Sequence, residues 1–148
     1  MKLLLDSSVW IDHFRGNVLA VVLPRLRGRY QLWMSGVVGA ELLAGGRSRT
    51  ERRAVDRLLA PFRKAGRVLA ADSEDLLASG RALSRLRERG VMLRQPGAAL
   101  LDALIAVNAV RVGALLVSAN SDDFRKLSSV LPVRFEPWEE FRSRATTG

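Results

Sequence analysis

Short apolar runs alternate with longer stretches of helical periodicity along the chain. Apolar residues recur three and four positions apart in the longer stretches, as on one face of a helix. The apolar runs predict strands at Lys2–Leu5, Tyr30–Ser35, Arg67–Ala71, Ala114–Val117 and Pro132–Phe135. The helices predicted between them cover Val9–Phe14, Asn17–Arg29, Gly36–Gly45, Ser48–Ala60, Glu74–Arg89, Ala98–Val112 and Ser121–Leu127. This alternation predicts an α/β fold with a mostly parallel sheet that helices cover on both faces.

Prolines and chain length set the expected boundaries of the helices and of the domain. We expect Pro24 to disturb the middle of the second helix and Pro61 to stop the fourth one. The chain has 148 residues, which is about the length of one domain. We therefore expect a single domain over residues 1–148, with a charged tail from about residue 139.

Composition excludes several classes of protein. The run Ala98–Val110 carries Asp102 and Asn108 and falls short of the roughly 18 to 20 apolar residues of a membrane span. The apolar run at Lys2–Leu5 is too short for a secretory signal, so we expect a cytoplasmic protein. With no cysteine and one histidine, the chain lacks disulfides and the usual zinc ligands, and any metal ion must be held mainly by oxygen.

The net charge of +9 would draw the protein toward polyanions such as nucleic acid, or toward an acidic protein. Only Lys2, Lys64 and Lys126 are lysines, so 21 of the 24 basic residues are arginines. Guanidinium groups suit phosphates and carboxylates. A genome that favours arginine codons would produce the same bias.

Acidic residues fall where a parallel sheet binds ligands, at the carboxyl ends of its strands. Asp6 follows the first strand, and Asp122 and Asp123 follow the fourth; any of these could instead cap a helix. Glu41 interrupts an apolar helix, although it could be that helix's one solvent-facing position. Asp102 lies in a helix that is apolar on all sides, where a carboxylate needs a metal ion, a wet cavity or an arginine partner.

Four carboxylates gathered without a counter-charge would raise each other's pKa. A hard divalent cation such as Mg²⁺ or Mn²⁺ resolves this conflict, because it prefers oxygen ligands and is usually shared with substrate phosphate. Such an ion also supports phosphodiester hydrolysis. In a basic protein, this pattern indicates an enzyme that hydrolyses phosphodiester bonds.

Four segments together resemble PIN-domain ribonucleases, and more narrowly the VapC-like toxins of bacterial toxin–antitoxin pairs. They are residues 4–12 (LLDSSVWID), 41–45 (ELLAG), 102–106 (DALIA) and 120–124 (NSDDF). The resemblance extends from residue 3 to about residue 138. It implies a PIN-like α/β/α sandwich with a mostly parallel sheet of four or five strands.

The same resemblance implies a Mg²⁺- or Mn²⁺-dependent endoribonuclease that cleaves tRNA, rRNA or mRNA. Asp6, Glu41 and Asp102 would be the core metal ligands and Asp123, or its neighbour Asp122, the fourth acid. Ser8, Ser118 and Asn120 would orient these ligands or bound waters. Leu101 and the segment 92–97 depart from the family pattern. These departures affect the expected shape of the RNA groove more than the expected metal site. A cognate antitoxin would cover the groove, and a homodimer or a toxin–antitoxin hetero-oligomer is expected.

Other interpretations remain open. A PIN fold could bind RNA or a protein partner without catalysis. A haloacid-dehalogenase-like phosphatase would need an acid at the position of Ser8. We expect His13 to be a surface or groove residue, and Trp10, Trp33 and Trp138 to pack in the core or at a sheet edge, although Trp10 could stack an RNA base.

Overall fold

The computed structural model describes residues 1–16 and 19–147. Asn17 and Val18, where the second helix was expected to begin, and Gly148 of the expected tail lie outside the described residues. The strands are β1 (Lys2–Leu5), β2 (Gln31–Ser35), β3 (Val68–Leu69), β4 (Leu115–Ser118) and β5 (Arg134–Pro137). The helices are α1 (Ser7–Gly16), α2 (Leu19–Arg29), α3 (Gly36–Gly45), α4 (Arg49–Lys64), α5 (Ser73–Glu88), α6 (Ala99–Val112), α7 (Ser121–Ser128) and α8 (Trp138–Thr147), with a short 3-10 turn, η1 (Pro96–Ala98).

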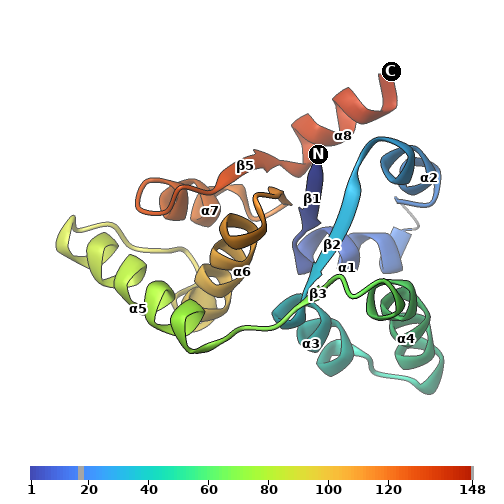
Figure 1. Ribbon diagram of the computed structural model, residues 1–148, viewed down its shortest axis with the longest axis horizontal. Helices are drawn as coiled ribbons and strands as arrows, with labels where there is room; N and C mark the ends of the chain where they lie inside the picture. Colours follow the sequence, from blue (N-terminus) through green and yellow to red (C-terminus); the bar gives the residue numbers. More distant parts are fainter. Residues whose placement is uncertain (17–18, 148) are drawn as a thin grey trace.

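The strands form one parallel sheet in the order β3-β2-β1-β4-β5. Figure 1 shows α5, α6 and α7 on one side of β1 and β2, and α1, α2 and α4 on the other. Helix α3 contacts both α1 and α6 and so links the two helical layers. The α/β/α sandwich predicted from the sequence is confirmed, and every strand pairing in the described residues is parallel.

The strand order places the ligand-binding edge at β1 and β4. The chain starts at the central strand β1, continues outward to β3, and then returns to β4 on the other side of β1. In such sheets, ligands bind beyond the carboxyl ends of the strands where the order reverses. Asp6 follows β1 and Ser118 ends β4, so both lie at this point.

Two prolines lie inside helices that the sequence analysis expected them to interrupt. Pro24 lies within α2, and α4 continues through Pro61 to Lys64. The expected end of α4 at Ala60 was therefore wrong. Phe62 follows Pro61 and is buried in the core, and burial of an aromatic side chain offsets the backbone hydrogen bond that a proline removes.

The end of the chain is a helix, where the sequence indicated only a charged tail. Helix α8 contacts α2, and its Trp138, Phe141 and Ala145 belong to the hydrophobic core. The charged residues between them face solvent, which explains why the segment has the composition of a tail. In the described ranges, every helix is too short or too polar to span a bilayer.

Candidate active site

Asp6 is held by serine hydroxyl groups from both sides of the reversal point in the sheet. The carboxylate is buried, and its Oδ2 accepts hydrogen bonds from Ser8 Oγ at 2.8 Å and from Ser118 Oγ at 2.7 Å. Its Oδ1 has one longer contact, 3.4 Å from Ser7 Oγ. Two of the predicted supporting residues, Ser8 and Ser118, therefore contact the first acid directly and fix its orientation.

Asp102 is a buried carboxylate without a cationic partner among the described residues. It lies in the first turn of α6 with 7% of its surface exposed, and its Oδ2 has no hydrogen-bond partner there. Burial raises its pKa to about 7, and the charges of Asp6, Glu41 and Asp123 add to this effect. The arginine partner that the sequence left open is not present in the described residues.

Glu41 projects from α3 toward the same group of acids. It is half-buried, and its Oε2 has no hydrogen-bond partner in the part of the chain that the structure describes. Burial raises its pKa, a hydrogen bond with Ser7 opposes this shift, and the charge of Asp6 adds to it. Ser7 thus contacts two acids. The sequence analysis did not assign Ser7 to the site, although it stands between Asp6 and Ser8.

The two neighbouring aspartates of α7 have different surroundings. Asp123 is buried, and its two oxygens accept the backbone N–H groups of Arg94 at 2.6 Å and Gln95 at 3.2 Å. Asp122 pairs with Lys126 at 2.7 Å, and the Lys126 hydrogen bond lowers its pKa. Asp123 therefore acts electrostatically on Asp102 while it holds the loop before α6, and Asp122 faces solvent.

Three other candidates can also be placed. Asn120 precedes α7 and contacts the site through its backbone N–H, which donates to Ser118 Oγ at 2.9 Å. His13 Nδ1 accepts the backbone N–H of Leu19 at 3.3 Å, and burial lowers its pKa. Trp10 is 1% exposed and meets the Phe62 ring edge-on. Trp10 is therefore a packing residue and cannot stack an RNA base.

The acids influence one another without forming a compact metal cage. Among the described residues, no group of three or more Asp, Glu or His side chains is arranged so that it could hold a metal ion. Two buried carboxylate oxygens, Glu41 Oε2 and Asp102 Oδ2, nevertheless have no hydrogen-bond partner within residues 1–16 and 19–147. The acids offer only oxygen atoms as metal ligands, and the repulsion between their negative charges is uncompensated. These ligands therefore fit a hard divalent cation.

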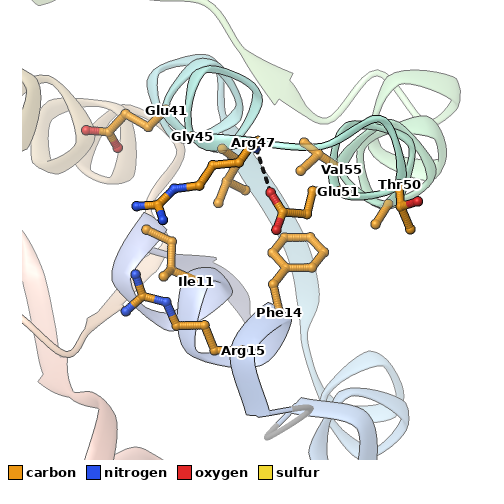
Figure 2. Close-up of a pocket in the computed structure, with 12 residues that line it drawn as sticks. Ile11, Phe14, Arg15, Glu41, Gly45, Arg47, Thr50, Glu51 and Val55 are labelled. Carbon is orange, nitrogen blue, oxygen red and sulfur yellow. Dashed lines mark hydrogen bonds between the residues drawn. The ribbon is translucent and has the colours of Figure 1, made fainter.

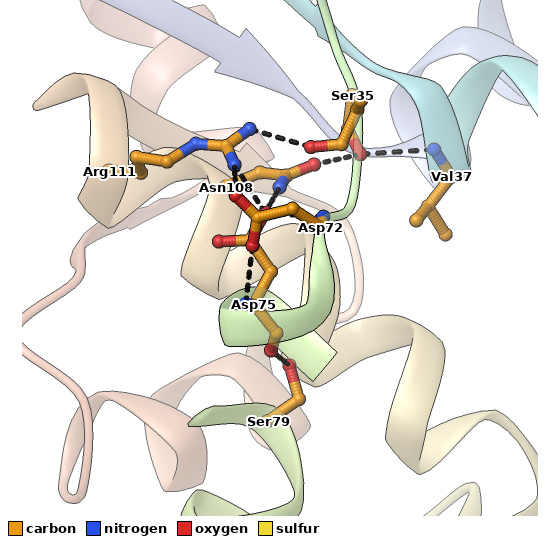
Figure 3. A network of polar contacts seen from close by, with 8 residues as sticks. Ser35, Val37, Asp72, Asp75, Ser79, Asn108 and Arg111 are labelled. Atoms are coloured by element: carbon orange, nitrogen blue, oxygen red, sulfur yellow. Dashed lines mark hydrogen bonds and ion pairs between the residues drawn. The ribbon is translucent and has the colours of Figure 1, made fainter. Parts of the chain in front are cut away.

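A buried polar network joins the two helices that carry Glu41 and Asp102 (Figure 3). Ser35 Oγ accepts the Val37 N–H at the start of α3 and donates to Asn108 Oδ1 on α6 at 2.8 Å. Asn108 Nδ2 in turn donates to Asp75 Oδ2 at 3.3 Å, and Arg111 pairs with the same oxygen at 2.5 Å. The network fixes α3 relative to α6. The sequence analysis assigned no role to Asn108 or Asp75.

A cavity of about 540 Å³ opens beside Glu41, between α1, α3 and the start of α4. Figure 2 shows the Arg15 and Arg47 guanidinium groups on the side where Glu41 lies, and the Phe14 ring near Glu51 across the cavity. The remaining lining is mainly aliphatic: Ile11, Leu42, Ala54 and Val55. The site thus extends from a group of acids into a pocket that combines apolar and positively charged side chains.

Comparison with known proteins gives one family and several solved folds. The family model described as PIN domain matches residues 3–130. No curated protein matches the chain in sequence comparison. VapBC-1 from nontypeable Haemophilus influenzae is similar in structure, with a TM-score of 0.69 and 22% identity over 94% of this chain and 99% of that one.

Two further structures have a similar fold. DNA-bound VapBC from Salmonella typhimurium has a TM-score of 0.68 and 19% identity, and the match covers 93% of this chain and 98% of that one. VapBC-5 from Mycobacterium tuberculosis, described as a member of a family of toxin–antitoxin systems, has a TM-score of 0.60 and 20% identity over 92% of this chain and 98% of that one. At these identities, the likeness concerns the fold.

Proposed function

This chain belongs to the PIN domain family, and we propose that it is a VapC-like toxin: a Mg²⁺- or Mn²⁺-dependent endoribonuclease that a cognate antitoxin neutralises. The observation that carries this proposal is Asp102. Its carboxylate is buried beside three other acids, and no cation offsets its charge in the described residues. A fold that keeps such a charge inside loses stability, so the arrangement points to a bound cation and thus to function.

Asp6, Glu41 and Asp102 would hold the ion, with Asp123 contributing charge from the side. When bound, the ion would withdraw charge from the scissile phosphate and make an attacking water more acidic. The Ser8 and Ser118 hydroxyl groups hold Asp6 Oδ2, which keeps the other carboxylate oxygen directed away from them. The buried network around Asn108 and Asp75 maintains the relative position of α3 and α6.

Charge and fold support the rest of the proposal. The net charge of +9 suits an RNA substrate. Solved structures of similar fold are described as VapBC pairs, which supports a protein partner that neutralises this chain. We further propose that the protein acts in the cytoplasm. It would assemble as a homodimer or with its antitoxin, using exposed apolar side chains such as Val21 of α2 and Leu43 of α3.

RNA cleavage tests the proposal directly. Purified protein should cleave RNA in the presence of Mg²⁺ or Mn²⁺, leave a 5′-phosphate, and stop when EDTA is added. Asp102→Asn should abolish cleavage with the fold intact, whereas the matched variant Asp122→Asn, on the solvent-facing acid, should retain it. Cleavage that persists in EDTA or in Asp102→Asn would refute the mechanism.

Growth and binding assays separate the toxin from two alternatives. Growth arrest on expression, relieved by co-expression of a neighbouring gene product, would identify a toxin, whereas cleavage without arrest would indicate a housekeeping nuclease. RNA binding without cleavage under every metal condition would favour the catalytically inactive PIN-fold module.

A further inference from the structure

The cavity beside Glu41 presents apolar side chains at its surface. Ile11 and Phe14 are three residues apart on α1, and they are 36% and 41% exposed. Both line the cavity of about 540 Å³, which lies within the range of small-ligand pockets. An exposed aromatic ring in a concave site next to the acids is available to a ligand, because the protein's own core does not cover it.

Unpaired positive charge lies at the same place. Within the described part of the chain, neither Arg15 nor Arg47 has a carboxylate at ion-pair distance. Glu51, the second acid of the lining, is already used at the start of α4, where its Oε2 accepts the Arg47 N–H at 2.6 Å and the Ser48 N–H at 3.3 Å. The two guanidinium groups are therefore free to bind an anion beside Glu41.

We propose that this cavity binds one nucleotide of single-stranded RNA next to the cleaved phosphodiester. The base would lie against Phe14 and Ile11, and a phosphate would lie between Arg15 and Arg47. Stacking of bases on aromatic side chains and pairing of phosphates with arginine are the usual contacts of single-stranded RNA. The inference rests on the proposed function, because it requires the RNA to reach Glu41.

The first test measures RNA affinity without cleavage. An Asp102→Asn background in EDTA is titrated against a fluorescein-labelled single-stranded RNA of about ten nucleotides. Phe14→Ala should weaken binding about tenfold, and Phe14→Tyr should restore it. Leu77→Ala is the matched control, because Leu77 is 52% exposed on α5, in the opposite helical layer. Equal affinity in Phe14→Ala and the control would overturn the proposal.

The second test isolates the phosphate contacts. Arg15→Gln and Arg47→Gln should each reduce the slope of log affinity against log salt by about 0.7, the value for one phosphate contact on a single strand. Arg81→Gln on α5 removes the same charge from an exposed position outside the cavity. If Arg81→Gln reduces the slope equally, the arginines act only through net charge and the phosphate site is refuted.

The third test asks whether an RNA base contacts the Phe14 ring. A series of RNAs is made in which one abasic residue occupies each position in turn. For the protein that keeps Phe14, affinity should fall at only one of these RNA positions. The Phe14→Ala protein should show no further loss there, because the contact is already absent. If the loss from the abasic residue and the loss from Phe14→Ala simply add at every RNA position, no base lies on this ring.

Cleavage kinetics distinguish failure of this inference from failure of the proposed function. With Asp102 present, Phe14→Ala should raise KM about tenfold with little change in kcat. Cleavage with an unchanged KM would refute the nucleotide site and leave the nuclease intact. Weaker RNA binding in a protein that never cleaves would support the site and refute the nuclease. Unchanged RNA affinity, with weakened binding of a protein partner, would assign the cavity to a protein segment and overturn the proposal.

Discussion

Replacing Asp102 by asparagine should stabilise the metal-free protein at neutral and alkaline pH. The side chain is 7% exposed, and burial and the charges of Asp6, Glu41 and Asp123 raise its pKa to about 7. Asparagine has nearly the same shape and no charge. The variant that should abolish activity is therefore also expected to relieve a strain that the folded protein carries when no cation is bound.

The size of this effect follows from the pKa. Because the pKa rises from 3.8 in a free aspartate to about 7 in the fold, the folded state keeps a proton that the unfolded chain releases. Stability should therefore fall as the pH rises between these two values. At about 1.4 kcal/mol per unit the full shift is worth about 4 kcal/mol, which local relaxation and water penetration reduce to about 2 kcal/mol.

Thermal unfolding followed by circular dichroism in EDTA measures the gain. For a chain of this length, about 2 kcal/mol corresponds to an increase in Tm of about 4 to 8 °C at about pH 8. The gain should be less than half as large near about pH 5, because only about one of the roughly three pH units between the two pKa values has then been crossed. Added Mn²⁺ should raise the Tm of the unsubstituted protein and not that of Asp102→Asn.

Asp122→Asn provides the control on the same face of the sheet. Lys126 lowers the pKa of this exposed carboxylate, so removing its charge should slightly reduce stability at pH values above its usual pKa. A gain from Asp102→Asn that is equal at both pH values, or a loss at about pH 8, would refute the assignment of Asp102 as an uncompensated buried charge.

Three further predictions concern the parts that support the site. Asp75→Asn should cost about 3 kcal/mol in urea unfolding, because it removes the charge that pairs with Arg111 in a buried network; a cost below 1 kcal/mol, roughly that of a surface pair, would contradict this. Asp123→Asn should speed amide hydrogen exchange at Arg94, since one of its two acceptor oxygens becomes a donor; unchanged exchange would show that the loop is held otherwise. Phe141→Ala should cost about 3 to 5 kcal/mol of stability by leaving a cavity under α8, and a smaller loss would show that α8 is not part of the core.

The parts of the fold that are apolar in a regular pattern could be predicted from sequence. The strand at Lys2–Leu5 and the helix at Gly36–Gly45 have the predicted bounds. For this helix, Ser35 caps the start by accepting the Val37 N–H, and Gly45 and Gly46 stand at its end; these are local signals. The third strand was predicted over Arg67–Ala71 and is only Val68–Leu69, where it pairs with β2 at the edge of the sheet.

The site could be predicted only as a set of acids at one edge. Asp102 was identifiable because a carboxylate in an all-apolar helix has few satisfactory environments. The bond from Asn108 to Asp75 joins residues 33 positions apart, and the cavity joins α1 to α4. Neither leaves a local signal, because each depends on how distant elements pack.

The last segment of the chain bears on where this folding unit ends. The family match stops at residue 130, yet β5 pairs with β4 along its whole length, and α8 closes the core behind it. A chain truncated at residue 130 would leave β4 as an unprotected edge strand, with open backbone groups ready to pair with another molecule. Because β4 ends at Ser118, which holds Asp6, aggregation and disturbance of the acids would arise from the same cut.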